Sequence, residues 1–200
     1  MHVLYTNADC LHNKLSELNL LIKSLKYKPK IIAITEFKDK CKQNVLIQEF
    51  SIPGYSLYCN DIYSSSRGVL IYVDSNLESS EISINSLFNE YVVVKIKGAN
   101  GVYLTVCNVY RSPNSSCEND TNLSELINKL CCNTKGDILI VGDFNLGDIN
   151  WGNYTAPNNN LSSQLFIKVL RDNLLTQLTD TPINQSQRYR YSSYSRFSHC

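Results

Sequence analysis

The sequence predicts a mixed α/β (α+β) domain in which helices cover the outer faces of β-sheets. Two patterns carry this prediction: apolar runs of strand length bounded by Gly, Asn, Pro and Ser, and three longer segments with apolar residues at helical spacing. The composition agrees, because 200 residues that are 43% hydrophobic suit one domain with its own core. No internal repeat breaks the chain into smaller units.

The expected strands and helices come in mixed order along the chain. The strands, in sequence, are HVLYTNA (2–8), KIIAITE (30–36), YSLYCN (55–60), RGVLIYVD (67–74), EYVVVKIKG (90–98), VYLTVCNVY (102–110) and DILIVGD (137–143). The helices are LHNKLSELNLLIKSL (11–25), NLSELINKLCC (122–132) and LSSQLFIKVLRDNLL (161–175). The four strands between 55 and 110 follow one another without a helix, which favours antiparallel hairpins over a doubly wound sheet.

Charge and cysteine content restrict the function classes. The chain has 19 basic and 18 acidic residues, so no global positive field indicates nucleic-acid binding, although a local groove can still be positive. The eight cysteines form no Cys-x-x-Cys pair, and the chain opens on strand-like HVLY instead of a signal peptide. We therefore expect reduced, packing cysteines in an intracellular protein. No apolar run reaches the roughly 18 residues of a membrane helix.

Polar side chains close several of the expected strands. Asn7 follows VLYT, Glu36 follows IIAIT, Tyr110 ends LTVCNVY, and Asp143 and Asn145 follow ILIVG. Each has an ordinary alternative as a turn, a helix cap or the point where a strand meets water. Taken together, they are expected to converge on one edge of a pair of sheets. Carboxylates and amides there form the all-oxygen environment that Mg²⁺ prefers, and such an ion would polarise a phosphodiester.

The motifs occur in the order of a known superfamily. Asn7, ITE at 34–36, YRSPN at 110–114 and GDFN at 142–145 resemble the endonuclease/exonuclease/phosphatase superfamily. The longer segments YTNADCLHNKLSEL, PKIIAITE, RGVLIYV and GDFNLGDINW resemble the apurinic-endonuclease-like domain of non-LTR retrotransposon polyproteins, over about residues 3 to 182. The resemblance implies a four-layered sandwich of two mixed β-sheets flanked by helices, with a site at their common edge.

The resemblance also implies roles for individual residues. Glu36 would hold Mg²⁺ (or Mn²⁺), with Asn7 beside it on the ion or the phosphate. Tyr110 would donate its hydroxyl to the scissile phosphate. Asp143 would align and deprotonate the attacking water, and Asn145 would hydrogen-bond a phosphoryl oxygen. These roles suit phosphodiester cleavage, in which positioning and charge neutralisation supply most of the rate.

Two further residues of the YRSPN motif are candidate contacts to the substrate. Arg111 and Asn114 directly follow the strand that ends at Tyr110, so both are expected near the same edge. The inferred substrate is DNA, and the chain is expected to act as a monomer without a membrane. In an intact ancestral polyprotein it would precede a reverse transcriptase and work in the nucleus.

The end of the chain departs from the family pattern. The superfamily completes its site with an Asp on a late strand and a terminal Asp-His pair, whereas no Asp or Glu follows Asp180 and the one late histidine is His199. We therefore expect a C-terminally truncated domain at residues 1–182 that lacks its last strands. Residues 183–200, rich in Ser, Tyr and Arg, are expected to be a disordered, unpaired tail.

Several functions remain open at this point. The main hypothesis is a Mg²⁺-dependent target-site nicking endonuclease of a retroelement, impaired in this chain. The alternatives are a catalytically dead relic and a non-enzymatic DNA- or protein-binding module. A small-molecule phosphatase of the same superfamily is a further alternative, which the retroelement-like motifs disfavour.

Overall fold

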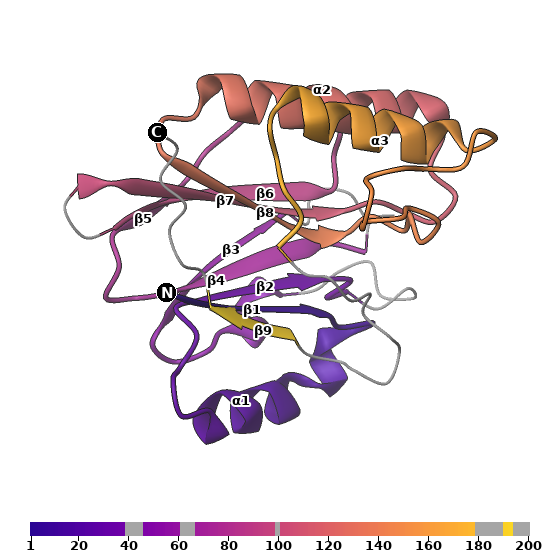
Figure 1. The fold of residues 1–200 in the computed structure, drawn as a ribbon. Coiled ribbons are helices and arrows are strands. Elements are labelled where there is room, and N and C mark those ends of the chain that lie inside the picture. Colours follow the sequence, from indigo (N-terminus) through magenta and orange to yellow (C-terminus); the bar gives the residue numbers. More distant parts are fainter. Residues whose placement is uncertain (39–45, 61–66, 99–100, 179–189, 194–200) are drawn as a thin grey trace.

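A computed structural model describes residues 1–38, 46–60, 67–98, 101–178 and the backbone of 190–193. The chain forms four layers: one helix, two stacked β-sheets and a pair of helices (Figure 1). This arrangement confirms the predicted sandwich of two mixed sheets with helices outside. No helix in the described part of the chain is long and apolar enough to cross a bilayer.

The first sheet has five strands in the order β3-β4-β2-β1-β9. Their bounds are β1 His2–Asn7, β2 Ile31–Thr35, β3 Tyr55–Asn60, β4 Val69–Asp74 and β9 Arg190–Ser193. β1 and β2 are parallel, with Asn7 opposite Thr35, and β4 is antiparallel to β2. Both β1 and β2 therefore end at the edge of the sheet where β4 begins.

The second sheet has four strands in the order β5-β6-β7-β8. Their bounds are β5 Ser79–Glu81, β6 Tyr91–Lys97, β7 Tyr103–Tyr110 and β8 Asp137–Asp143. The hairpin β6-β7 is antiparallel, whereas β7 and β8 are parallel and place Tyr110 opposite Asp143. The parallel pair needs a long crossover, which α2 (Cys117–Asn133) supplies.

The two sheets pack face to face through alternate side chains of their strands. Ile71 of the first sheet and Val94 and Val106 of the second are fully buried in this shared core. The strands carry β-branched residues in near-continuous runs because most of them are covered on both faces. The core thus fixes the position of each strand end relative to the others.

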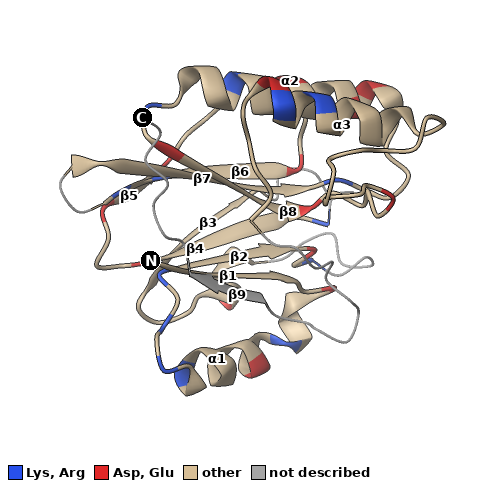
Figure 2. Ribbon diagram, in the orientation of Figure 1, with Lys and Arg blue, Asp and Glu red and all other residues tan. Residues whose placement is uncertain are grey.

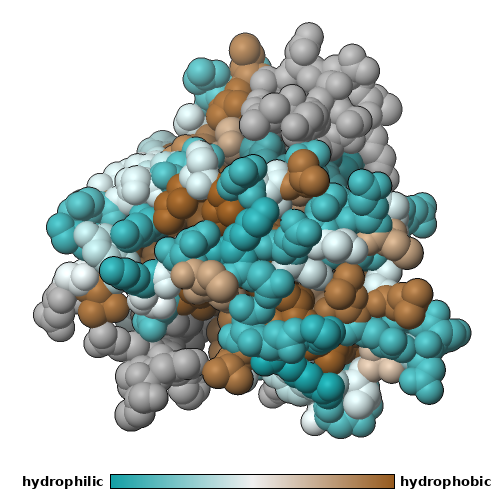
Figure 3. Space-filling view, turned by 90° about the horizontal axis from the view of Figure 1, so that it is seen from above, coloured by the Kyte–Doolittle hydropathy of each residue, from teal (hydrophilic) through white to brown (hydrophobic). Residues whose placement is uncertain are grey.

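Helices cover the two outer faces of the sandwich. α1 (Leu15–Ser24) buries Leu18 and Ile22 against the first sheet, together with the short 3₁₀ turns η1 (Leu11–Asn13) and η2 (Ile47–Phe50). α2 and α3 (Leu161–Asp172) lie side by side over the second sheet (Figure 1). Seen from that side, their outer surface mixes hydrophilic and hydrophobic side chains (Figure 3).

The sequence located the main elements and missed the short ones. All seven expected strands and all three expected helices are present, with ends shifted by a few residues. The strand β5 was missed because Ser79–Glu81 is polar and carries no apolar alternation.

The expected unpaired tail is wrong for Arg190–Ser193, because this backbone forms β9 and pairs antiparallel with β1. Edge pairing needs only backbone groups, so a segment without an apolar pattern can supply it. Residues 183–189 and 194–200 lie outside the described residues, and the expected disorder there stays a prediction.

A buried asparagine joins the two sheets through the core. Asn108 of β7 donates its amide nitrogen to the backbone carbonyls of Ile34 in β2 and Leu70 in β4, both at 2.9 Å. Asn108 is fully buried, so these bonds replace water that it cannot reach. The Asn108 side-chain oxygen is buried without a partner in the protein, and so is the hydroxyl of Thr105, three residues earlier on β7.

We expect Asn108→Ala to lower the free energy of unfolding by about 2 kcal/mol, because two buried hydrogen bonds are lost. Thr105→Val should cause no loss or a small gain, since it removes a buried hydroxyl without a partner. Urea unfolding of both variants measures the difference. Equal losses in the two variants would contradict this account of Asn108.

Gly142 is required by the close approach of β8 to β7. Its φ is +151°, and a Cβ built there would lie 1.9 Å from the carbonyl oxygen of Val109. We expect Gly142→Ala to lower the free energy of unfolding by about 2 kcal/mol or more, as measured by urea unfolding. The control is Gly147→Ala, since an added Cβ there meets nothing within 4 Å. A similar loss in both variants would rule out the predicted steric cause.

Candidate functional site

The ends of four strands meet along one edge of the sandwich, which we call the rim. β1 and β2 of the first sheet and β7 and β8 of the second end there, so the polar residues that follow them are brought together. Acidic and basic segments lie next to one another at this edge (Figure 2). The predicted convergence of polar strand ends is therefore seen in the structure.

The Asn7 side chain links the two predicted carboxylates. Its amide nitrogen donates to Glu36 Oε1 and to Asp143 Oδ2, each at 2.8 Å. The two carboxylate oxygens are therefore no further apart than twice that distance. Asn7 ends β1 and Glu36 follows β2 in the first sheet, whereas Asp143 ends β8 in the second, so the bond from Asn7 to Asp143 joins the two sheets.

Glu36 lies at the centre of the rim contacts. Besides Asn7, it lies close to the Tyr110 hydroxyl and forms a 2.7 Å ion pair with Arg67 Nη2. The same Arg67 nitrogen lies 2.6 Å from Asp9 Oδ1. Sequence reasoning did not identify Arg67 or Asp9, although Asp9 stands only two residues after Asn7.

Tyr110 is held as a neutral hydrogen-bond donor. Burial raises the pKa of its hydroxyl above the ordinary value, and the negative charge of Glu36 raises it further. Its side chain is buried, and its backbone N–H donates to the carbonyl of Glu90 at 2.9 Å. Both its charge state and its position are thus fixed before any substrate binds.

Glu90 is a second acidic residue that sequence reasoning missed. Burial raises the pKa of its carboxyl, while the backbone N–H of Arg67 and the Ser112 hydroxyl donate to it. Its position just before β6 carries no distinctive motif. It lies close enough to Glu36 for the two charges to repel.

The turn after β8 is fixed by hydrogen bonds. The backbone N–H of Asn145 donates to Asp143 Oδ1 at 3.1 Å, and its side-chain nitrogen donates to the carbonyl of Arg111 at 2.7 Å. Arg111 N–H in turn donates to the carbonyl of Asp143 at 2.8 Å. The YRSPN and GDFN motifs therefore support each other.

Arg111 lies differently from the predicted substrate contact. Its guanidinium is buried and pairs with Asp120 of α2, at 2.6 and 3.0 Å, and also donates to the Phe144 carbonyl at 3.2 Å. In this structure Arg111 braces the turn after β8 and does not face solvent. Asn114, the other candidate contact, lies exposed in the turn that precedes α2.

Three rim residues adopt left-handed backbone conformations. The φ angles are +41° at Asp9, +53° at Glu36 and +50° at Asn145. Such angles are uncommon outside glycine and cost of order 1–3 kcal/mol where the environment enforces them. Cys10, Tyr154 and Leu174 also have positive φ angles, so the rim is one of several places where the backbone is constrained in this way.

The oxygen atoms of the rim suit a hard divalent cation. Glu36, Asp143 and Asp9 supply carboxylates, and Mg²⁺ is commonly held by one or two carboxylates with water completing its shell. Among the described residues, no group of three or more Asp, Glu, His or Cys side chains is arranged to hold a metal ion, so an ion here would be held by fewer side chains and by water. Asn7 presents its nitrogen to both carboxylates, so here it orients them, and its predicted role as a metal ligand stays a prediction.

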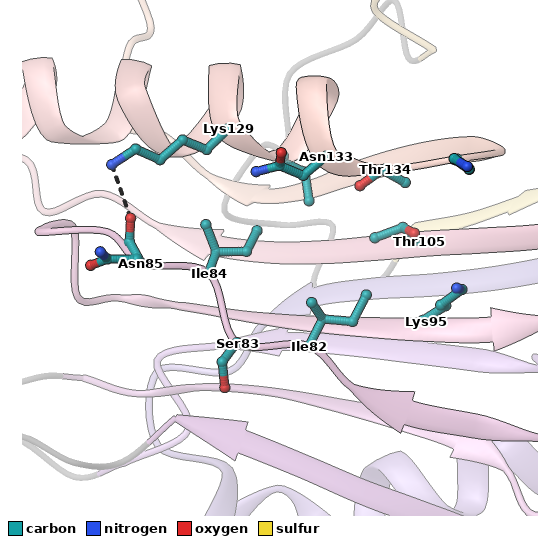
Figure 4. A pocket seen from close by; sticks show the side chains of 11 residues that line it. Ile82, Ser83, Ile84, Asn85, Lys95, Thr105, Lys129, Asn133 and Thr134 are labelled. Atoms are coloured by element: carbon teal, nitrogen blue, oxygen red, sulfur yellow. Dashed lines mark hydrogen bonds between the residues drawn. The ribbon is translucent and has the colours of Figure 1, made fainter.

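A pocket of about 360 Å³ lies away from the rim, between the end of α2 and the segment before β6 (Figure 4). It contains no carboxylate, and Lys129 closes one side by donating to the Asn85 carbonyl at 2.9 Å. Thr105 borders the pocket. It stands five residues before Tyr110 on β7, so the pocket and Tyr110 are separated by roughly 17 Å along the strand. The pocket is therefore separate from the convergent polar residues.

Residues 104–196 match a family model described as endonuclease-reverse transcriptase. No significant match is found among curated proteins. The family match extends past residue 182, where the sequence-based domain boundary was drawn.

Several solved nucleases share the fold. The endonuclease domain of TRAS1, a telomere-specific non-LTR retrotransposon, is 16% identical with a TM-score of 0.61, over 96% of this chain and 81% of that one. A 3′-5′ exonuclease from Neisseria meningitidis is 17% identical with a TM-score of 0.58, over 86% and 71%. An AP endonuclease from Leishmania major is 12% identical with a TM-score of 0.62, over 86% and 66%.

We expect Asp120→Asn to lower the free energy of unfolding by about 3 kcal/mol at neutral pH, because it leaves the buried Arg111 charge unpaired. Burial opposes ionisation of Asp120, but the hydrogen bonds from Arg111, Ser162 and Ser115 and the charge of Arg111 together outweigh it, so the pKa of Asp120 is lowered. The contribution is therefore present above the ordinary carboxyl pKa and lost as the pH falls through the lowered pKa.

Urea unfolding from neutral to acidic pH tests this, because the difference between wild type and Asp120→Asn should shrink on acidification. The control is Asp172→Asn, which removes an exposed carboxylate paired with Lys168 on α3 and should cost little. A difference that is independent of pH would contradict the ion-pair explanation.

Proposed function

We propose that this chain is a retrotransposon endonuclease-like domain and that it hydrolyses phosphodiester bonds of DNA with Mg²⁺. The observation that supports this most is the double hydrogen bond of Asn7, which holds the carboxylates of Glu36 and Asp143 side by side across the two sheets. A fold alone does not define an activity, so the proposal depends on this group of side chains.

Asp143 is proposed as the general base. One of its oxygens accepts from Asn7 and the other from the backbone N–H of Asn145, so the carboxylate has a fixed direction. A carboxylate held in this way can accept the proton of an attacking water once a phosphate lies against the rim. An ionised carboxylate only accepts hydrogen bonds, which matches the contacts of Asp143 in this structure.

Tyr110 and Asn145 are proposed as donors to the phosphoryl oxygens. The raised pKa of Tyr110 keeps its hydroxyl protonated and able to donate across the working pH range. Fixed donors of this kind stabilise the charge that builds up on the phosphoryl group. Asn145 is positioned for this role by its bond to the Arg111 carbonyl.

Glu36, with Asp9 next to it, is proposed to hold the Mg²⁺ ion. When bound, the ion would neutralise charge on the phosphate and lower the pKa of nearby water. Mn²⁺ takes similar ligands and is expected to substitute. In the intact polyprotein, the domain would be joined to a reverse transcriptase and act in the nucleus.

The rate is proposed to be low. Loss of one donor to a developing oxyanion costs about 10²- to 10³-fold in rate, and the sequence carries no Asp or Glu after Asp180 to orient a late histidine. Residues 1–200 should therefore nick supercoiled plasmid in Mg²⁺ at least about 100-fold more slowly than the TRAS1 endonuclease domain in the same assay.

The residual nicking rate should fall by a further factor of about 100 or more in Asp143→Ala, because the general base is lost. Asp172→Ala, which removes an exposed carboxylate on α3, should leave it unchanged. Nicking that survives Asp143→Ala would refute the proposed base. DNA binding without any nicking would instead support the non-catalytic binding module, and a rate equal to that of TRAS1 would refute the proposed impairment.

A further inference from the structure

Arg67 reaches into the rim from the strand next to β2. It stands two residues before β4, and the register that pairs Val69 with Thr35 places it beside Glu36. Its Nη2 lies 2.7 Å from Glu36 Oε2 and 2.6 Å from Asp9 Oδ1, so one nitrogen lies between two carboxylates. A divalent cation held by these two residues would need the same place.

The ion pair between Arg67 and Glu36 is largely shielded from solvent, whereas Asp9 is open to it. The side chains of Arg67 and Glu36 are 12% and 14% exposed, whereas Asp9 is 71% exposed. Shielding strengthens the attraction between the guanidinium and Glu36. The open side at Asp9 leaves a route by which an ion from solvent can reach the pair.

The backbone of Arg67 is held more firmly than its guanidinium. Its N–H donates to the Glu90 carboxylate, and its carbonyl accepts from the Lys38 N–H at 3.0 Å. The guanidinium Nε, by contrast, is buried and has no hydrogen-bond partner in the protein. A buried donor without a partner costs free energy, which offsets part of what the two ion pairs of the guanidinium contribute.

We propose that Arg67 is a built-in cation that occupies the metal position between Asp9 and Glu36, and that a divalent ion binds there only by displacing the guanidinium. The proposal rests on the metal-dependent function proposed above and adds a regulatory step to the same site. Without metal, Arg67 neutralises the two carboxylates and keeps them close together. With metal, the ion takes over that charge and Arg67 turns away.

Two effects of opposite sign follow from this exchange. If the position is open in a tenth of the molecules or fewer, the apparent affinity for metal is at least about tenfold weaker than the intrinsic affinity. Removal of Arg67 should therefore tighten metal binding. It should also destabilise the metal-free protein, because the carboxylates of Asp9 and Glu36 would then repel each other.

The experiment compares Mn²⁺ binding by isothermal titration calorimetry to wild type, Arg67→Ala and a matched control. The control is Lys14→Ala. Lys14 lies at the same edge, where its side chain donates to the backbone carbonyls of Ala8 and Asp9. The substitution therefore also removes one positive charge near the site. We expect Mn²⁺ to bind Arg67→Ala at least about tenfold more tightly than wild type, with Lys14→Ala within about twofold. Glu36→Gln combined with Arg67→Ala should abolish the gain.

Thermal unfolding gives a second measurement. Arg67→Ala should melt below wild type without metal and gain more than wild type when Mn²⁺ is added. Arg67→Lys keeps a charge and should lie between the two proteins, so it also serves if Arg67→Ala fails to fold.

The outcomes separate this proposal from the one on which it rests. Equal Mn²⁺ affinity in wild type and Arg67→Ala would overturn the displacement and leave metal binding intact. Equal gains in Arg67→Ala and Lys14→Ala would reduce the effect to general electrostatics and also overturn it. Absence of Mn²⁺ binding in all the proteins would instead refute the proposed metal dependence.

Discussion

Three asparagine side chains tie the two sheets together, and the geometry of the rim depends on them. Asn108 bonds from β7 to carbonyls of β2 and β4, and Asn60 bonds from β3 to the carbonyls of Asn89 and Tyr91 beside β6. Asn7 completes the set by joining Glu36 to Asp143. Hydrophobic packing between sheets is not directional, whereas these amides allow only one relative position of the strands. Glu36 and Asp143 both lie at hydrogen-bonding distance from the Asn7 nitrogen because these bonds fix the two sheets relative to each other.

The sequence was informative wherever a side chain acts through its own strand. A buried apolar run ends where the chain reaches solvent, so the sequence pattern alone assigns Asn7, Glu36 and Asp143 to one edge. The strand β9 could not be found in this way, because it pairs through its backbone and carries no apolar alternation.

The sequence could not predict ion pairs between residues that lie on different elements of the fold. Asp120 sits on a helix that looks like any amphipathic helix, and nothing local shows that it meets Arg111. Arg111 was consequently predicted as a substrate contact, although the structure buries it as a brace. Arg67 was read as the start of a strand, because its partners Asp9 and Glu36 lie 58 and 31 positions earlier in the chain. Such pairs follow from the topology of the sheets and not from any local pattern.

Arg111 and Arg67 both place a positive charge beside carboxylates, but they differ in how far they are buried. A rim that gathers carboxylates must supply positive charge, since like charges at close range oppose one another. Arg111 does so from inside, where its pair with Asp120 is almost closed to solvent and no ion can replace it. Arg67 is itself mostly buried, but it pairs with the exposed carboxylate of Asp9, where we propose that an ion can compete. Burial thus separates a structural ion pair from an exchangeable one within the same site.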